Sequence, residues 1–227
     1  MAYNYLGLVN EVNRRLNEVE LNSSNFAGAT GYYSFAKDAI NSSIRHINQE
    51  EFEWPFNHVE AEEILVPGTV RYSMPYDAKT VNMNSFRIKR NADLKVETVK
   101  LKVLNYEEYL DKYADSEYNS TNTGQPRFVV RAPSQELLFV PAPDKEYEVI
   151  YEYYTLSFDL NLATDIPTLP EAYKHVIVDG AMYYVYQFRG DLQAAQLALQ
   201  KFEQGIKQLR SIFINRTEYL RDTRVYY

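Results

Sequence analysis

The first part of the chain carries a helical spacing of apolar residues. Between residues 3 and 21 such residues recur three and four positions apart, which predicts one amphipathic helix over that range. They are Leu6, Val9, Val12, Leu16 and Val19. After a polar loop with glycines, a second helical face begins at Phe35 and runs to Ile47. Because Pro55 disfavours helical backbone in the residue before it, we expect the second helix to stop by Trp54.

The spacing of apolar residues changes from helical to alternating between residues 59 and 156. In "TVKLKV", Val99, Leu101 and Val103 alternate with lysines, which predicts a strand with one wet face. "SFRIKR" and "EYEVIYEYY" alternate in the same way, and "RFVVRAPSQELLFVPAP" predicts two strands joined by a turn. A short helix over 106–113 and a mobile polar loop, "SEYNSTNTGQ", interrupt the strands. Together these elements predict a mainly antiparallel β domain.

Helical spacing returns at "TLPEAYKHVIVDGAMYYVYQF", which has the markers of a helix start. We expect Thr168 to cap this helix, with Pro170 in the first turn and Glu171 completing a capping box. Gly190 is suited to end the helix in the left-handed conformation, and Asp191 is suited to cap the next helix. A connection this short makes the two helices antiparallel neighbours.

The last helical pattern ends at Phe213 and is followed by a segment of different composition. Its apolar residues are Leu192, Ala195, Leu199, Phe202, Ile206, Leu209 and Phe213. We expect this seam to pack on the preceding helix, where Gly180 and Ala181 permit close approach. The final segment, "INRTEYLRDTRVYY", is rich in arginine and tyrosine, which are enriched at binding hot spots. Fully extended it reaches about 45 Å, so we expect an arm that lies along a partner; the alternative is a strand on its own β domain.

The order of these elements predicts an α+β protein. A helical bundle is built from both ends of the chain, with an inserted mainly antiparallel β domain and an extended C-terminal arm. The expected boundaries are 1–57 and 166–213 for the helical bundle, 58–165 for the β domain and 214–227 for the arm.

The chain's single tryptophan lies where the first helical segment gives way to the β domain. Pro55 halts the helix, and Trp54 and Phe56 are expected to fill the junction between the bundle and the inserted domain. Leu169 and Pro170 are expected to bring the chain back into the bundle at the same junction. The alternative interpretation of Trp54 is a platform for a ligand.

Charge and composition favour a protein that makes contacts over one that grips nucleic acid. The formal net charge is -7, whereas phosphate binding needs clustered Lys and Arg. The absence of cysteine excludes disulfides and thiolate metal sites, and 21 tyrosines suit half-buried sheet faces and protein interfaces. No apolar run is long enough for a membrane helix, and the first residues lack a signal-peptide layout. We therefore expect a soluble protein made in a cytoplasm, with no membrane partner.

Candidate catalytic and metal-binding residues form no recognised motif. The histidines, His46, His58 and His175, stand far apart, and none belongs to an H-E-x-x-H pair. Glu171 and His175 lie four apart, but a capping Glu and a surface His account for them. The acidic clusters are Glu60, Glu62 and Glu63, and Glu107, Glu108 and Asp111. They offer general acids, yet their charged neighbours favour a solvated face. We expect no enzymatic activity, no cofactor and no metal.

Two segments carry a resemblance to a known family. In "RHINQEEFEWPFNHVEAEEILVP" a helix ends in Trp and Phe before a strand that stops in Val and Pro. In "PTLPEAYKHVIVDGAMYYVY" a Leu-Pro-Glu helix entry leads into an aromatic helix. With the free arm, this order of elements resembles the head-to-tail adaptor proteins of short-tailed bacteriophages, the family that includes tail tubular protein A. The β region looks longer than in the compact members of that family.

The resemblance implies a structural virion protein without enzymatic activity, made in the host cytoplasm and located at the head-tail interface. It implies a ring, usually of twelve copies, beneath the portal, through which DNA passes during ejection without sequence-specific binding. The helical bundle would pack against copies of itself, and the β domain would face the tail nozzle. The arm would bind the portal through Tyr219, Leu220, Arg221, Arg224, Val225, Tyr226 and Tyr227. The net acidity agrees, since a DNA channel should repel phosphate.

Three other functions stay open from the sequence. A head-completion or stopper protein of another phage type would share the DNA channel without necessarily sharing the nozzle contact. A carbohydrate- or peptide-binding module of a tail fibre would use exposed tyrosines, but the stripe from Tyr147 to Tyr153 shares its face with Val149, which favours a core position. An acid-based hydrolase would use the Glu and Asp clusters.

Overall fold

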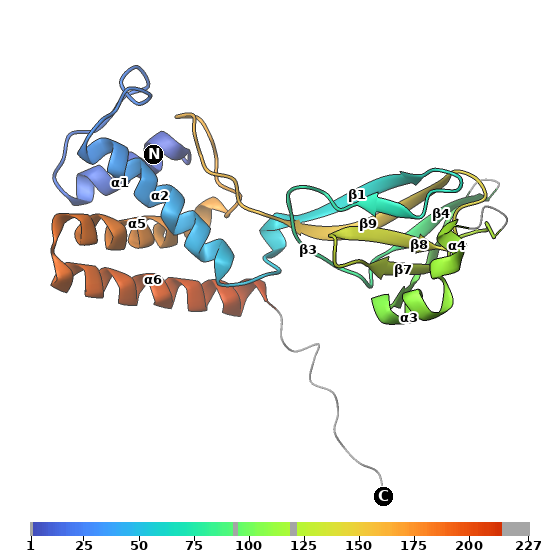
Figure 1. Ribbon diagram of the computed structural model, residues 1–227. Coiled ribbons are helices and arrows are strands. Elements are labelled where there is room, and N and C mark those ends of the chain that lie inside the picture. The colour runs from blue at the N-terminus through green and yellow to red at the C-terminus, as the bar shows by residue number, and fades with distance from the viewer. Residues whose placement is uncertain (1, 93–94, 119–121, 215–227) are drawn as a thin grey trace, which may run out of the picture. The chain divides into compact units, whose positions relative to one another are not determined.

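The computed structural model describes residues 2–92, 95–118 and 122–214, and the chain divides into two units (Figure 1). One unit comprises the residues up to Asn57 and those from Ser157 onward, and the other is His58–Leu156. Helices form the first unit and antiparallel sheets form the second, so the predicted α+β class with an inserted β region is confirmed. Residues 157–165, which the sequence assigned to the β domain, belong to the helical unit.

The helical unit is organised around one central helix. Its helices are α1 (Tyr5–Arg15), α2 (Tyr32–Gln49), α5 (Lys174–Arg189) and α6 (Leu192–Phe213), with 3-10 turns η1 (Pro55–Asn57) and η2 (Glu171–Tyr173). The central helix, α5, packs against α1, α2 and α6. Its sequence is accordingly apolar on several sides, with Val176, Ile177 and Val178 buried in succession. The turn between α5 and α6 is as predicted: Gly190 has φ 75° and the Asp191 side chain accepts from the Ala194 amide.

The first helix is shorter than the sequence predicts. Helix α1 ends at Arg15 rather than continuing to residue 21, and Val19 is 73% exposed. The chain leaves the helix because Asn17 adopts a left-handed conformation with φ 56°, which asparagine tolerates better than most residues. Beyond this turn, the buried Asn10 side chain holds Leu21 by accepting from its amide and donating to its carbonyl, each at 2.8 Å.

Close approach at Gly180 lets α5 contact two helices at once. A Cβ atom on Gly180 would lie 2.2 Å from Ser43 Oγ on α2 and 2.6 Å from Phe202 Cε2 on α6. The Ser43 hydroxyl is itself committed, because it donates to the Ile177 carbonyl at 2.8 Å. The close packing expected at this glycine is confirmed.

The β unit is a sandwich of two sheets. One sheet has the order β1-β9-β4-β5, with β3 also pairing with β9, and the other has the order β2-β8-β7-β6. The strands are β1 (His58–Leu65), β2 (Arg71–Ser73), β3 (Ala78–Val81), β4 (Arg87–Ala92), β5 (Lys95–Lys100), β6 (Lys102–Leu104), β7 (Phe128–Arg131), β8 (Glu136–Val140) and β9 (Tyr147–Thr155). The described pairs are antiparallel apart from β6 with β7, which is parallel.

The second sheet is buried on both faces, which explains the continuous apolar run in β8. Leu137 and Phe139 point into the core between the sheets. Leu138 and Val140 point to the opposite face, where helix α3 (Tyr106–Lys112) covers them with the buried Tyr109. The first sheet contributes the tyrosine stripe to the core between the sheets: Tyr151 and Tyr153 are 2% and 8% exposed. These buried rings offer no sugar-binding platform.

Two sequence predictions in the β unit are wrong. The "TVKLKV" segment is not one strand with one wet face, because Leu101 separates β5 from β6 and the two strands belong to different sheets. The alternation loses phase at the crossing, so Val103 is 44% exposed and Leu104 is buried instead. The segment after α3 is not wholly a loop, since α4 forms over Ala114–Tyr118. Residues 119–121 of the predicted mobile loop lie outside the described residues.

We predict that Gly180→Ala lowers the free energy of unfolding of the helical unit by about 1–3 kcal/mol, the usual cost of overpacking. The added methyl group has nowhere to go between Ser43 and Phe202. Denaturant unfolding followed by helical circular dichroism measures the change. Gly28→Ala is the matched control, because nothing lies within 4 Å of a Cβ at that position. Equal losses of unfolding free energy in the two variants would show that the close contact at Gly180 does not limit the stability of the helical unit.

Candidate functional site

The residues that the sequence assigned to partner binding and to the domain junction fall into two groups. The seven arm residues, Tyr219, Leu220, Arg221, Arg224, Val225, Tyr226 and Tyr227, lie outside the described residues. The junction residues lie in the helical unit. Two surfaces that the sequence did not single out, a groove on the helical unit and a charged sheet face on the β unit, complete the candidate partner-binding surfaces.

Trp54 is part of the core of the helical unit. Its side chain is 0% exposed and its Nε1 donates to the Ile47 carbonyl at 2.8 Å. Phe56 stacks on the indole with ring centroids 5.2 Å apart and meets Phe213 of α6 edge-on at 5.7 Å. A buried, hydrogen-bonded indole leaves no open face for a ligand, so the platform interpretation of Trp54 does not fit this geometry. The pair instead links the end of α2 to the end of α6.

The returning chain is fastened beside Trp54. The Thr168 hydroxyl donates to Asn57 Oδ1 at 2.9 Å, and Asn57 Nδ2 donates to Asn48 Oδ1 of α2. Thr168 therefore does not cap the following helix, and this prediction is wrong. The helical region begins with η2 at Glu171, after Pro170 in extended conformation, and no side chain caps it. The Thr168 hydroxyl, which a capping box would require, joins the two halves of the helical unit through Asn57 instead.

The segment before Thr168 is fastened to the N-terminal helices as well. Asn41 of α2 donates from Nδ2 to the Leu160 carbonyl and accepts from the Leu160 amide at Oδ1, both at 3.0 Å. The Tyr5 amide of α1 donates to the Asp165 carbonyl at 2.8 Å. Sequence reasoning missed these contacts, although an asparagine on the apolar face of α2 was a signal, because a buried amide needs partners.

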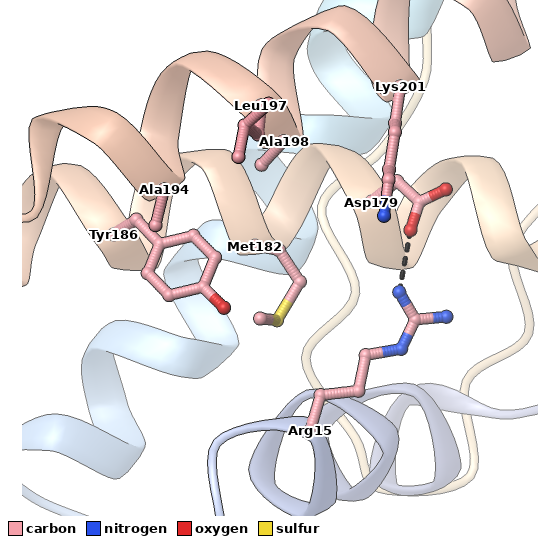
Figure 2. Close-up of a pocket in the computed structure, with 8 residues that line it drawn as sticks. All are labelled: Arg15, Asp179, Met182, Tyr186, Ala194, Leu197, Ala198 and Lys201. Atoms are coloured by element: carbon pink, nitrogen blue, oxygen red, sulfur yellow. Dashed lines mark hydrogen bonds and ion pairs between the residues drawn. The ribbon is translucent and has the colours of Figure 1, made fainter.

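A groove on the helical unit lies among α1, α5 and α6 (Figure 2). It has a volume of about 280 Å³ and is lined by Arg15, Asp179, Met182, Tyr186, Ala194, Leu197, Ala198 and Lys201. The Arg15 guanidinium pairs with the Asp179 carboxylate at 2.6 Å on one side of the groove. Met182 and Ala198 are buried, whereas Leu197 is 62% exposed. An apolar centre with a charged rim is the usual anatomy of a protein interface.

The candidate catalytic residues are not brought together. His46 contacts Tyr184 in the helical unit, where its Nδ1 lies 3.2 Å from the tyrosine oxygen, and His58 lies in the β unit. Glu171 pairs with Lys174 at 3.5 Å rather than with His175. In the described ranges, no three His, Asp or Glu side chains are close enough to hold a metal ion. Across the same ranges, none of the helices combines the length and apolarity needed to cross a membrane.

An ion-pair network fixes α4 to the second sheet. Arg71 on β2 binds Glu117 of α4 through Nε at 2.5 Å and Nη2 at 3.1 Å, and binds Glu136 of β8 through Nη1 at 3.0 Å. The Tyr109 hydroxyl donates to Glu117 at 2.7 Å. Hydrogen bonds from Arg71 lower the pKa of Glu117, and those from Ser134 and then Arg71 lower the pKa of Glu136. Both carboxylates are thus held charged.

The fold defines an α+β protein with a helical unit built from both ends of the chain and an inserted β sandwich, and these surfaces are its candidate contacts. A comparison with family models gives its particular family, since residues 3–225 match the model of the SU10 adaptor protein. The chain belongs to this family of phage adaptor proteins, and the resemblance found in the sequence is confirmed at that level. A search of curated proteins found no match.

Family membership defines the general role of the chain. It is a phage adaptor protein and a component of the virion. Adaptor proteins of this kind have a structural role and interact with other head and tail proteins of the phage. The surfaces described above are therefore candidate contacts with such proteins.

We predict that Trp54→Ala lowers the free energy of unfolding by about 3–5 kcal/mol, as expected for a large buried ring. The substitution leaves a cavity beside Phe56 and removes the donor to the Ile47 carbonyl. Helical circular dichroism in urea measures the loss. Phe52→Ala is the control, because Phe52 is 64% exposed and two residues away. Similar small effects of both variants would contradict the core position of Trp54.

We predict that Glu117→Gln destabilises the β unit by about 1–2 kcal/mol at pH 7. The folded pKa of Glu117 is lowered, so its stabilising contribution is present above the unfolded pKa of about 4.3 and is lost as pH falls through the folded value. The difference between wild type and variant should therefore vanish in acid. Unfolding at several pH values measures it, with Glu107→Gln as an exposed control on α3. A difference that persists in acid would rule out this carboxylate as its source.

Proposed function

We propose that copies of this protein form a ring that joins the portal to the tail nozzle and lines part of the DNA channel. The observation that carries the proposal is the adaptor family match, which spans residues 3–225 and therefore includes both units. The protein acts without enzymatic activity or a cofactor. It is made in the host cytoplasm and takes its place in the virion at the head-tail interface, in a ring of twelve copies by analogy with the resembling family.

The helical unit is proposed to make the contacts between copies. The groove among α1, α5 and α6 supports this role, since it combines buried apolar residues with the exposed Leu197 and the charged Arg15 and Lys201. The junction residues Trp54, Pro55, Phe56, Leu169 and Pro170 are proposed to set the exit and return of the inserted β unit. The packed core of the helical unit keeps the surface that each neighbouring copy would contact in a fixed shape.

The remaining partners are proposed to be the nozzle and the portal. The β unit faces the tail nozzle, and the arm from residue 214 binds the portal through Tyr219, Leu220, Arg221, Arg224, Val225, Tyr226 and Tyr227. DNA passes through without sequence-specific binding. The net charge of -7 supports this part, because an acidic ring repels the phosphate backbone and lets it slide.

Deleting residues 214–227 tests the arm. We predict that the truncated protein keeps its fold but no longer joins purified portal, because Arg and Tyr contacts of the proposed kind dominate binding energy. Co-sedimentation with portal measures joining, and the fluorescence of the buried Trp54 reports the fold. A variant in which glycines and serines replace the same 14 residues separates loss of sequence from loss of length. Joining that survives the deletion would contradict the role of the arm.

A further inference from the structure

Charges on the outward face of the first sheet are segregated by strand. On the β1–β9 side, Glu60 lies directly opposite Glu152. On the β4–β5 side, Arg87 lies directly opposite Lys100. The pairing of Arg87 with Ile150 places both sets on one face. The strand order β1-β9-β4-β5 places Glu60 and Lys100 on opposite edge strands, with Glu152 and Arg87 on the two strands between them. One edge is therefore acidic and the other is basic.

Each of these pairs sets like charges against one another, but the two inner residues have other neighbours. Glu152 lies 3.7 Å from His58 Nε2 and accepts from Asn82, and Arg87 lines a pocket together with Glu60 and Glu152. Like charges directly opposite one another across two strands destabilise a sheet. Among the described residues, no ion pair joins Glu60 to a cation or Lys100 to a carboxylate. Lys89, by contrast, binds both Glu62 and Glu148, so these two carboxylates are neutralised within the copy. The repulsion that remains lies toward the two edges, where a partner of opposite charge can relieve it.

The basic edge carries a cavity. It has a volume of about 550 Å³ and lies where the chain crosses from β5 to β6 and enters β7. Its lining includes the exposed cations Lys100, Lys102 and Arg127 together with Tyr113 and Phe128. Within the described part of the chain, no carboxylate forms an ion pair with any of these three cations. Cations beside aromatic rings suit carboxylates that arrive with apolar neighbours.

The acidic edge supplies such a group. Strand β1 pairs only with β9 among the described strands, so its other side is an unpaired edge. Its outward row carries Glu60 and Glu62 and continues into Ile64, which is 62% exposed, while Val66, just past the strand, is 52% exposed. An edge with carboxylates followed by exposed apolar side chains complements the basic and aromatic cavity in both charge and polarity.

We propose that the cavity at Lys100, Lys102 and Arg127 receives the β1 edge, with Glu60, of a neighbouring copy of this chain. The inference rests on the proposed ring and names a contact within it. The occupant follows from charge complementarity, because the same chain carries the matching acidic edge, whereas its net charge of -7 disfavours nucleic acid. Contacts between unlike surfaces of identical chains propagate in one direction, and they close into a ring when the rotation between copies closes.

Reciprocal charge reversal tests the contact. Glu60→Lys and Lys100→Glu each remove a like-charge pair within one copy, so each variant should melt at or above the wild-type temperature. Each nevertheless sets like charges against one another between copies, and should raise the concentration needed for ring assembly with purified portal by at least about tenfold. The double variant Glu60→Lys/Lys100→Glu, and an equimolar mixture of the two single variants, should assemble like the wild type.

Matched controls are Glu146→Lys and Lys145→Glu, which change the charge equally at exposed positions just before β9. Particle mass measures assembly. Single variants that assemble like the wild type, or a double variant that is no better than they are, would overturn the inference. Single variants that assemble normally but bind DNA less tightly than the wild type would also overturn the inference, because they would show that the cavity binds phosphate. Failure of wild-type protein to form a ring would instead refute the proposed function, and this contact with it.

Discussion

The helical unit depends on the hydrogen bonds that tie the returning segment, residues 157–170, to the N-terminal helices. Leu160 exchanges two hydrogen bonds with the Asn41 side chain, and Asn57 accepts from Thr168. Because a whole β unit is inserted between Asn57 and Ser157, the unit has to be assembled from two distant parts of the chain, and these contacts offset the loop-closure entropy. Because the buried side-chain amides find these partners in only one alignment, they also fix the position of the returning segment.

Packing around α5 stabilises the helical unit further. Gly180 brings α2 and α6 into contact with α5, while Trp54, Phe56 and Phe213 join the ends of α2 and α6. The β unit has separate cores of its own, one between its sheets and one beneath α3. A phage adaptor interacts with other head and tail proteins, and this division places the groove and the sheet edges on separately packed units.

The spacing of apolar residues predicted the types of the elements and their order, because a helix or strand that is buried on one face repeats its apolar residues at a clear period. Sequence patterns missed features that depend on distant residues. The helix ending at Arg15 needed the turn at Asn17, and the break at Leu101 needed two sheets. Thr168 looked like a cap because its distant partner, Asn57, was not evident. The like-charge pairing of Glu60 with Glu152 was missed for the same reason, because it forms only after residues far apart in sequence have paired.

The helical unit is held by its own contacts and carries the β unit as an insertion. Replacing residues 58–156 with a short glycine linker tests it, since His58 and Tyr154 are paired neighbours where the chain enters and leaves the β unit. The measurement is the fluorescence of Trp54 during urea unfolding. A self-supporting helical unit should show the emission of a buried indole and a cooperative transition. The emission of a solvent-exposed indole before any urea is added would contradict this self-support.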